Sequence, residues 1–185
     1  MGKFVLALAA AACVLAACGC GTTMTEDQRR AKTAAALERF AAKLVDEGAM
    51  SDERIFQALE AQLGRNKFVF GAAYASAPDK TGPEESAKVL YVHREDGRLL
   101  RDFRPAYAFA KAATAAWYTA PLKSGKPEWA APYFDVDGAG AQVKMTTYSL
   151  PVLKDGKLAF VVTSDLLLEE KEPADQPVAP RPPEK

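Results

Sequence analysis

The sequence carries no excess charge and few of the residues from which metal sites are built. Lysine plus arginine and aspartate plus glutamate number 24 each, so the formal net charge of the 185 residues is zero. A chain without a basic excess has no electrostatic footprint for nucleic acid, and we expect no such partner. His93 is the only histidine, and no Cys/His cluster accompanies it, which argues against a zinc site.

The motifs of common enzymes are absent as well. No serine or cysteine stands in a motif with a partner histidine, and no glycine-rich loop could cradle a phosphate. The run Asp135-Val136-Asp137-Gly138 superficially resembles a calcium loop, but the remaining ligands are missing at the required spacing, so we interpret it as a turn. We therefore predict no enzymatic activity, no cofactor and no metal.

The one long apolar run is confined to residues 1–17. Lys3 supplies a positive start and residues 4–15 an apolar stretch that is too short for a permanent membrane span, which is typical of a secretion signal. The following Leu-Ala-Ala-Cys tetrapeptide, ending at Cys18, resembles the bacterial lipobox. The resemblance implies cleavage before Cys18 and lipidation of its thiol; the alternative is an ordinary signal peptide with a chance cysteine. Because Gly19 is not aspartate, the resemblance favours the outer membrane.

Two helices are predicted after this segment. Apolar residues recur at three- and four-residue spacing from Thr25 to a terminating Gly48, and again from a capping Ser51 to about Gly64. We interpret both as packing helices. Beyond residue 168 the chain is charged and rich in proline, a composition that buries too little apolar surface to fold, so we predict a disordered tail over 169–185.

Five strands are predicted between the helices and the tail. They cover residues 67–75, 89–93, 98–103, 143–152 and 158–166. Asp96-Gly97 and Asp155-Gly156 are strong hairpin signals and join the second strand to the third and the fourth to the fifth. Residues 76–86 are expected to form a loop and residues 107–116 a helix. The fold class is therefore α+β, with a central antiparallel sheet of about five strands flanked by the N-terminal helices.

Aromatic residues gather between the third and fourth strands. Trp117, Tyr118, Trp129 and Tyr133 lie within seventeen residues and are separated by three prolines. Proline fixes φ and biases the preceding residue toward extended backbone. We therefore predict an irregular aromatic loop rather than a helix, lying against the end of the last hairpin.

This stretch resembles the Cache family, the PAS-like extracytoplasmic sensor domains of bacterial chemoreceptors and sensor kinases. The match is carried in order by the segments 117–121, 125–129, 132–135, 147–151 and 161–166. It extends upstream to residues 71–78 and 91–99. The resemblance implies a PAS-like Cache domain over 26–168, preceded by a signal over 1–17 and a lipidated linker over 18–25.

The resemblance also implies a ligand site. Family members that bind amino acids or amines line it with a Trp-Tyr pair and an aspartate on the last strand, which match Trp117, Tyr118 and Asp165. Trp129 and Tyr133 complete an aromatic inventory that, with one carboxylate, suits a small cation. The alternative is that these aromatic residues are core and loop scaffolding.

Two positions depart from the family pattern. Amino-acid-binding members place an arginine two residues before the Trp-Tyr pair, where this chain has Ala115, and this puts an α-amino acid ligand in doubt. Phe160 stands where the family generally has glycine. Because strand residues alternate between faces, Phe160 should lie opposite Val161 and Asp165 and alter helix packing rather than the site.

The sequence leads to one main hypothesis and one alternative from another class. The first is a periplasmic, lipid-anchored Cache protein that binds a small polar or cationic metabolite and reports to a separate membrane partner. The second is an accessory lipoprotein that binds no ligand and uses the fold as a protein-interaction surface, on a receptor or an envelope complex.

Overall fold

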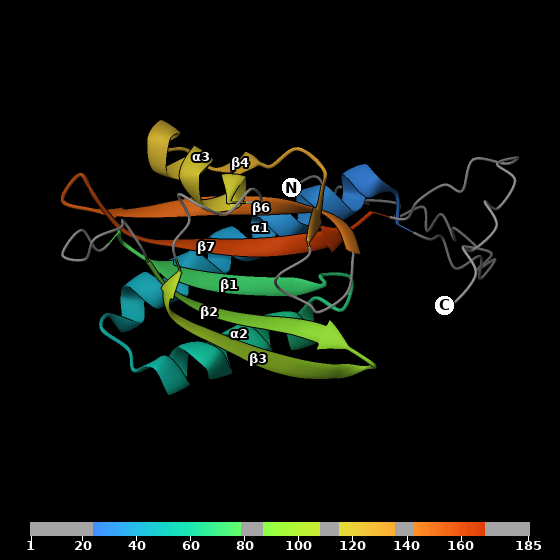
Figure 1. The fold of residues 1–185 in the computed structure, drawn as a ribbon, viewed down its shortest axis with the longest axis horizontal. Coiled ribbons are helices and arrows are strands. Elements are labelled where there is room, and N and C mark those ends of the chain that lie inside the picture. Colours follow the sequence, from blue (N-terminus) through green and yellow to red (C-terminus); the bar gives the residue numbers. More distant parts are fainter. Residues whose placement is uncertain (1–23, 79–86, 108–114, 136–142, 169–185) are drawn as a thin grey trace, which may run out of the picture.

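Two N-terminal helices pack on one face of an antiparallel sheet, and a short third helix packs on the other (Figure 1). The computed structural model describes residues 24–78, 87–107, 115–135 and 143–168. The predicted signal and linker residues 1–23, the acidic turn after Asp135 and the tail 169–185 lie outside these ranges. So do the central parts of the predicted loop 76–86 and helix 107–116.

Both N-terminal helices begin and end close to where the sequence predicts. Helix α1, Glu26–Glu47, starts in a capping box in which the Thr25 hydroxyl accepts from the Gln28 backbone N–H and the Gln28 side chain accepts from that of Thr25. Helix α2, Asp52–Arg65, is capped by Ser51. Among the described helices, none is both long and apolar enough to cross a membrane.

The sheet contains five long strands and two short ones. The long strands are β1 Gly71–Ser76, β2 Ala87–Glu95, β3 Arg98–Tyr107, β6 Val143–Lys154 and β7 Lys157–Leu167. The short strands β4, Glu128–Trp129, and β5, Tyr133–Asp135, both pair with β6. The order is β3-β2-β1-β7-β6-β4, so the first strand lies at the centre between the two hairpins. This confirms the predicted α+β class and its antiparallel sheet.

Both Asp-Gly pairs form the tight turns that they predict. Asp96 and Gly97 have φ of 48° and 75°, and Asp155 and Gly156 have φ of 53° and 74°. Two successive positive φ values define the type I′ turn, whose twist matches that of the strands it joins. The turns fix the register of both hairpins.

The two faces of the sheet have different partners. On the helix face, Leu37 of α1 and Leu59 and Leu63 of α2 are fully buried against Leu90 and Val162 of the strands. The opposite face is called the front face here and is turned toward the viewer in Figure 1. Its side chains follow from the strand register: Gly71, Ala73 and Ala75 of β1, Tyr91 and His93 of β2, Thr147 of β6, and Val161, Thr163 and Asp165 of β7.

The prediction of an irregular loop at Trp117 is wrong. Residues Ala116–Ser124 form helix α3, which contains Pro121 and ends at Gly125 in the left-handed region. Tyr118 and Pro121 are the buried residues of this helix, and Tyr118 packs on Ala73, Ala75 and Val161 of the front face. Burial against the sheet therefore outweighs the loss of one helical hydrogen bond at proline.

Candidate functional site

Asp165 is the only acidic residue among the buried side chains of the described chain. It is 4% exposed and lies on β7, at the front face. The Thr147 hydroxyl donates to its Oδ1 over 2.7 Å, and the Tyr133 hydroxyl lies 2.8 Å from the same Thr147 oxygen. Because Thr147 gives its one proton to the carboxylate, Tyr133 donates to Thr147. Three side chains from β5, β6 and β7 thus form one polar chain that ends at the carboxylate.

A glycine makes room for the other side of this carboxylate. A Cβ at Gly71 would stand 2.7 Å from Asp165 Oδ2 and 2.3 Å from the Tyr91 hydroxyl oxygen, distances that real side chains do not tolerate. Gly71 pairs with Asp165 on one side and with His93 on the other. The Tyr91 ring stacks on His93 with centroids 5.2 Å apart. Tyr91 therefore reaches over Gly71 toward Asp165, a proximity that the sequence interpretation missed.

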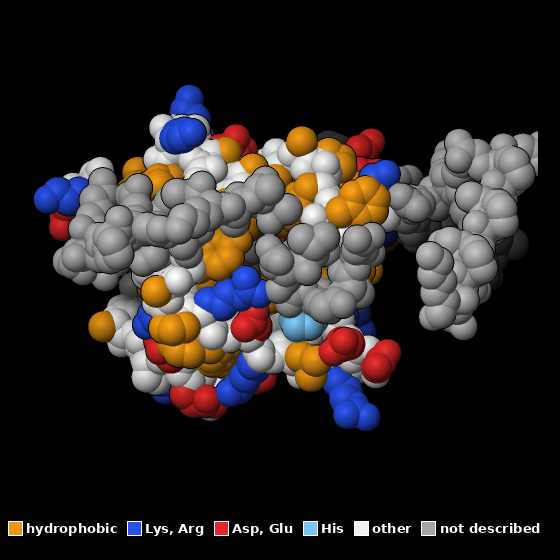
Figure 2. Space-filling model, viewed as in Figure 1, with side chains coloured by type: hydrophobic (Ala, Val, Ile, Leu, Met, Phe, Trp, Pro, Cys, Tyr) orange, Lys and Arg blue, Asp and Glu red, His pale blue; other side chains and the backbone are white. Residues whose placement is uncertain are grey.

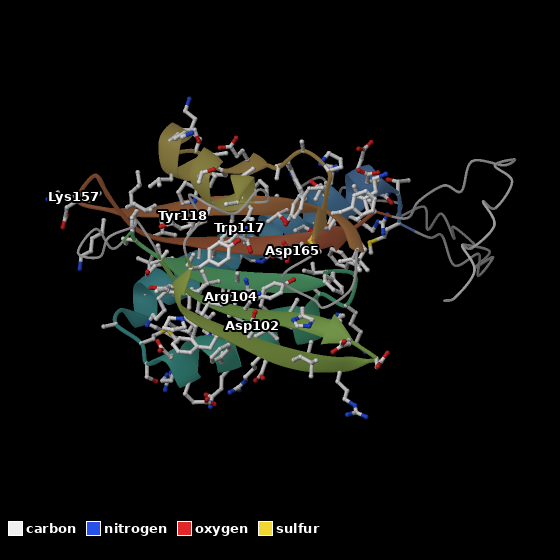
Figure 3. The ribbon with its side chains drawn as sticks, in the orientation of Figure 1. Asp102, Arg104, Trp117, Tyr118, Lys157 and Asp165 are labelled. Atoms are coloured by element: carbon white, nitrogen blue, oxygen red, sulfur yellow. The ribbon has the colours of Figure 1, made fainter. Side chains whose placement is uncertain are left out.

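The Trp-Tyr pair lies on α3, which packs on the same face of the sheet. Tyr118 is completely buried, and its hydroxyl donates to the Ser76 carbonyl over 2.9 Å, which ties the helix to β1. Trp117 is half-buried and meets the Tyr118 ring edge-on at 5.6 Å and the Tyr107 ring at 6.1 Å. Figure 3 shows Trp117 and Tyr118 projecting from the α3 side above the strand that carries Asp165. Tyr118 has a structural role, whereas Trp117 offers an accessible ring.

A pair of opposite charges lies on the same face, at the far edge of the sheet. Arg104 Nε and Asp102 Oδ2 of β3 are 2.9 Å apart, and the Arg104 guanidinium lies over the Tyr107 ring at 5.4 Å (Figure 3). Figure 2 shows this face, with the one histidine of the chain in pale blue. The alternation of β3 could have identified this pair, since Asp102 and Arg104 are two residues apart.

The strand register separates these two charged groups. Arg104 pairs with Val89, Val89 with Ala75, and Ala75 with Val161. Val161 is four residues from Asp165 on β7. Four residues along a strand and three strand spacings place the Arg104 and Asp165 Cα atoms roughly 19 Å apart. A small ligand at Asp165 would therefore not bring an α-carboxylate to Arg104, and Ala115, 3% exposed in the α3 contact, carries no charge.

Trp129 does not join the other predicted residues. It pairs with Tyr148 of β6, packs on that ring at 5.1 Å, and lies under the Arg30 guanidinium of α1 at 4.7 Å. These contacts belong to the helix face. Of the five candidate ligand residues, the structure gathers Trp117, Tyr118, Tyr133 and Asp165 on the front face.

Phe160 lies where strand alternation predicts. It packs against the helix-face core and meets the Tyr74 ring at 5.0 Å, while Val161 packs under Tyr118 on the front face. The departure from glycine at this position thus affects the helix side. Within the residues described, no three His, Cys, Asp or Glu side chains are grouped as a metal site would require.

Most of the described chain matches a known family of sensor domains. A family model for methyl-accepting chemotaxis protein-like proteins, first PDC sensor domain, matches residues 55–170. Comparison with curated proteins found no match.

Solved structures show the same fold. The extracellular domain of a protein described as a histidine kinase has a TM-score of 0.57 and 24% identity, over 77% of this chain and 53% of that one. The ligand-binding domain of the Campylobacter jejuni chemoreceptor Tlp3 with L-valine has a TM-score of 0.53 and 20% identity, over 77% of this chain and 53% of that one. The ligand-binding domain of the Pseudomonas aeruginosa amino acid chemoreceptor PctC with GABA has a TM-score of 0.50 and 21% identity, over 75% of this chain and 57% of that one. The chain spans about half the length of these structures.

Proposed function

Since the chain belongs to the family of methyl-accepting chemotaxis protein-like first PDC sensor domains, we propose that its front face binds a small cationic or polar metabolite. Domains of this family are sensory and ligand-binding rather than enzymatic. We further propose that the protein is lipid-anchored through Cys18 on the periplasmic side, with the outer membrane favoured. Ligand binding would then be reported to a separate membrane partner in signal transduction.

The observation that carries this proposal is the buried Asp165 carboxylate beside aromatic rings. A charge with 4% exposure must be compensated by hydrogen bonds or by an opposite charge. The Thr147 hydroxyl contributes one such bond, and a ligand ammonium would contribute a stronger, charge-assisted one. The half-buried Trp117 ring on the same face offers cation–π attraction to a ligand cation. L-Valine and GABA, found in two of the similar structures, both carry an ammonium group.

The surroundings of Asp165 favour an amine over an α-amino acid. An α-amino acid needs a cation within a few ångströms of the carboxylate that holds its ammonium, because its two charges sit on adjacent carbons. Ala115 carries no charge, and the strand register places Arg104 too far from Asp165 to bind the carboxylate of the same small ligand. We therefore propose an amine, or a ligand whose polar groups are neutral, as the preferred class.

A thermal-shift screen of the purified protein against amines, amino acids, carboxylates, purines and sugars tests the binding function. A ligand that binds only the folded state stabilises it by roughly 3 kcal/mol at a hundredfold excess over its dissociation constant. We expect a shift with an amine that is lost in Asp165→Asn, a substitution that keeps the shape and removes the charge. Asp155→Asn, in the exposed β6–β7 turn where asparagine tolerates positive φ, is the matched control.

Each outcome has a definite meaning. Full affinity in Asp165→Asn would remove this carboxylate from the site. No shift for any compound would contradict the ligand-binding function and support the accessory lipoprotein, whose partner would then be sought by crosslinking in the envelope.

Lipid anchoring is tested separately. Cells that express the chain are labelled with a radioactive fatty acid, and the protein is recovered from separated inner and outer membranes. We expect label in the wild-type protein, in the outer-membrane fraction, and none in Cys18→Ser. Equal labelling of both proteins would contradict the lipobox interpretation.

A further inference from the structure

A second concave site lies on the other side of the sheet, between α1 and α2. It has a volume of about 450 Å³, and its lining includes Arg39, Phe40, Lys43, Gln62 and Arg65. None of these residues contacts the front face, because α1 and α2 cover the opposite face of the sheet. The site is therefore separate from the proposed metabolite site.

The charged residues that line this pocket are all positive. Arg39 and Lys43 are one turn apart on α1, and Arg65 ends α2. Lys43 lies 3.4 Å from Glu47 in an exposed pair, whereas Arg39 and Arg65 have no ion-pair partner within 4 Å in the described chain. Two helices thus bring three cations together with one neighbouring carboxylate, an arrangement in which the cations repel each other unless an anion lies between them.

A buried amide at the same place supplies an independent observation. Gln62 is 4% exposed and lines the pocket, and its side-chain nitrogen Nε2 has no hydrogen-bond partner in the described chain. A buried N–H without an acceptor is costly, and such groups are rare in native proteins. An acceptor oxygen on a ligand in the pocket would supply the missing partner.

The end of a helix usually repels anions, because its last carbonyls are unpaired and carry partial negative charge. Here two of the last four carbonyls are occupied. The Gln62 carbonyl accepts from the Asn66 side chain over 2.8 Å, and the Leu63 carbonyl accepts from Arg94 over 2.6 Å. Arg94 also adds positive charge behind the helix end. Together with Arg39, Lys43 and Arg65, it offsets the partial negative charge of this helix end.

From these observations we propose that the pocket between α1 and α2 binds an oxyanion of the phosphate class. Arg39, Lys43 and Arg65 compensate its charge, and the Gln62 amide donates to one of its oxygens. The phosphate could be free in solution or belong to the headgroup of an anionic lipid. Arginine suits both because its planar donors match phosphate geometry.

The first source, free phosphate, is tested by titrating the purified whole chain with inorganic phosphate in a calorimeter. Flotation with vesicles of phosphatidylglycerol tests the second. Binding is taken as the excess over phosphatidylcholine vesicles, because the proposed lipid anchor at Cys18 inserts into both. The variant is Arg39→Gln with Arg65→Gln. We expect affinity to fall by about tenfold or more for each charge-assisted contact removed. A matched double variant, Arg98→Gln with Lys157→Gln, removes the same charge at the exposed hairpin turns and should bind as the wild type does.

Saturable phosphate binding that the pocket variant loses identifies a free oxyanion. Excess binding to phosphatidylglycerol vesicles without binding of inorganic phosphate, lost in the same variant, identifies a lipid headgroup. If neither probe binds, or if the pocket variant and the hairpin variant weaken binding equally, the proposal is overturned. Circular dichroism of each variant, with melting curves, shows that the fold is retained; because Arg39 and Arg65 are exposed, we expect no loss of structure.

Discussion

Gly71 is the residue on which the geometry around Asp165 depends. Its missing side chain leaves room for the Tyr91 hydroxyl and the Asp165 carboxylate above the backbone of β1. Gly71→Ala would place a methyl group inside the contact distance of both. We expect the variant to be less stable by about 1–3 kcal/mol, the usual cost of overpacking, and to lose amine binding because both side chains must shift. Urea unfolding and the thermal-shift screen measure the two effects.

Gly64→Ala is the control for this prediction. Gly64 lies near the end of α2, and a Cβ there would have nothing within 4 Å. Alanine loses less conformational freedom than glycine in a helix, so this change should stabilise the protein by roughly 0.5–1 kcal/mol. The argument for Gly71 fails if both variants shift stability in the same direction.

At single positions, the sequence predicted which face of the sheet a side chain takes wherever the two-residue alternation of a strand could be applied. Alternation along β7 correctly separated Phe160 from Val161 and Asp165, because this strand is long enough for the period to be read. It could not be applied to Trp129, since β4 has two residues and its register on β6 decides which face the ring takes. The proximity of Tyr91 to Asp165 depends on pairing across three strands, which no local pattern encodes.

Among the elements, α3 is the one that local sequence signals misrepresent. It has no side-chain cap and contains Pro121, so the sequence favours a loop, and tertiary burial of Tyr118 overrides that preference. The capped helices α1 and α2 and the two Asp-Gly hairpins were predictable because each carries its own local signal. The two-residue and three-residue strands β4 and β5 were missed because they carry no periodicity.

The hydrogen bond from Tyr118 to Ser76 should control how firmly α3 is held. Tyr118→Phe keeps the buried ring and removes the donor, at a cost of about 1 kcal/mol for one buried hydrogen bond. We expect the amides of α3 to exchange with solvent faster by about fivefold, while those of β7 and α1 change little. Amide hydrogen exchange detected by NMR measures the rates of α3 and of β7 and α1 in one sample. Unchanged protection of α3 would show that apolar packing alone holds it.

Across the whole molecule, one arginine of the outer hairpin β2–β3 binds two carboxylates of α2. Arg101 of β3 contacts Glu53 over 2.8 Å and Glu60 over 2.6 and 2.9 Å, and lies 5.0 Å from the Phe56 ring centroid. These hydrogen bonds raise the pKa of Arg101 above its ordinary range. The hydrogen bond from Arg101, followed by that from Gln57, lowers the pKa of Glu53 below its usual value of 4.5. The contact therefore links the packing of α2 against the hairpin to the protonation of Glu53.

The sign of this coupling gives a prediction for the stability of the whole fold. A carboxyl whose pKa is lower in the folded state contributes stability above its unfolded pKa, and loses it as the pH falls through the folded value. We expect Glu53→Gln to be slightly less stable than the wild type at pH 7, with the difference shrinking below about pH 4.5. The residue is fully exposed, so the difference should be small and should shrink further in 1 M salt. Urea unfolding from pH 7 to pH 3 measures it. An Arg101→Gln background should weaken its pH dependence but not remove it, because the hydrogen bond from Gln57 remains. If the difference persists unchanged in that background, Glu53 acts through the start of α2 and not through the hairpin.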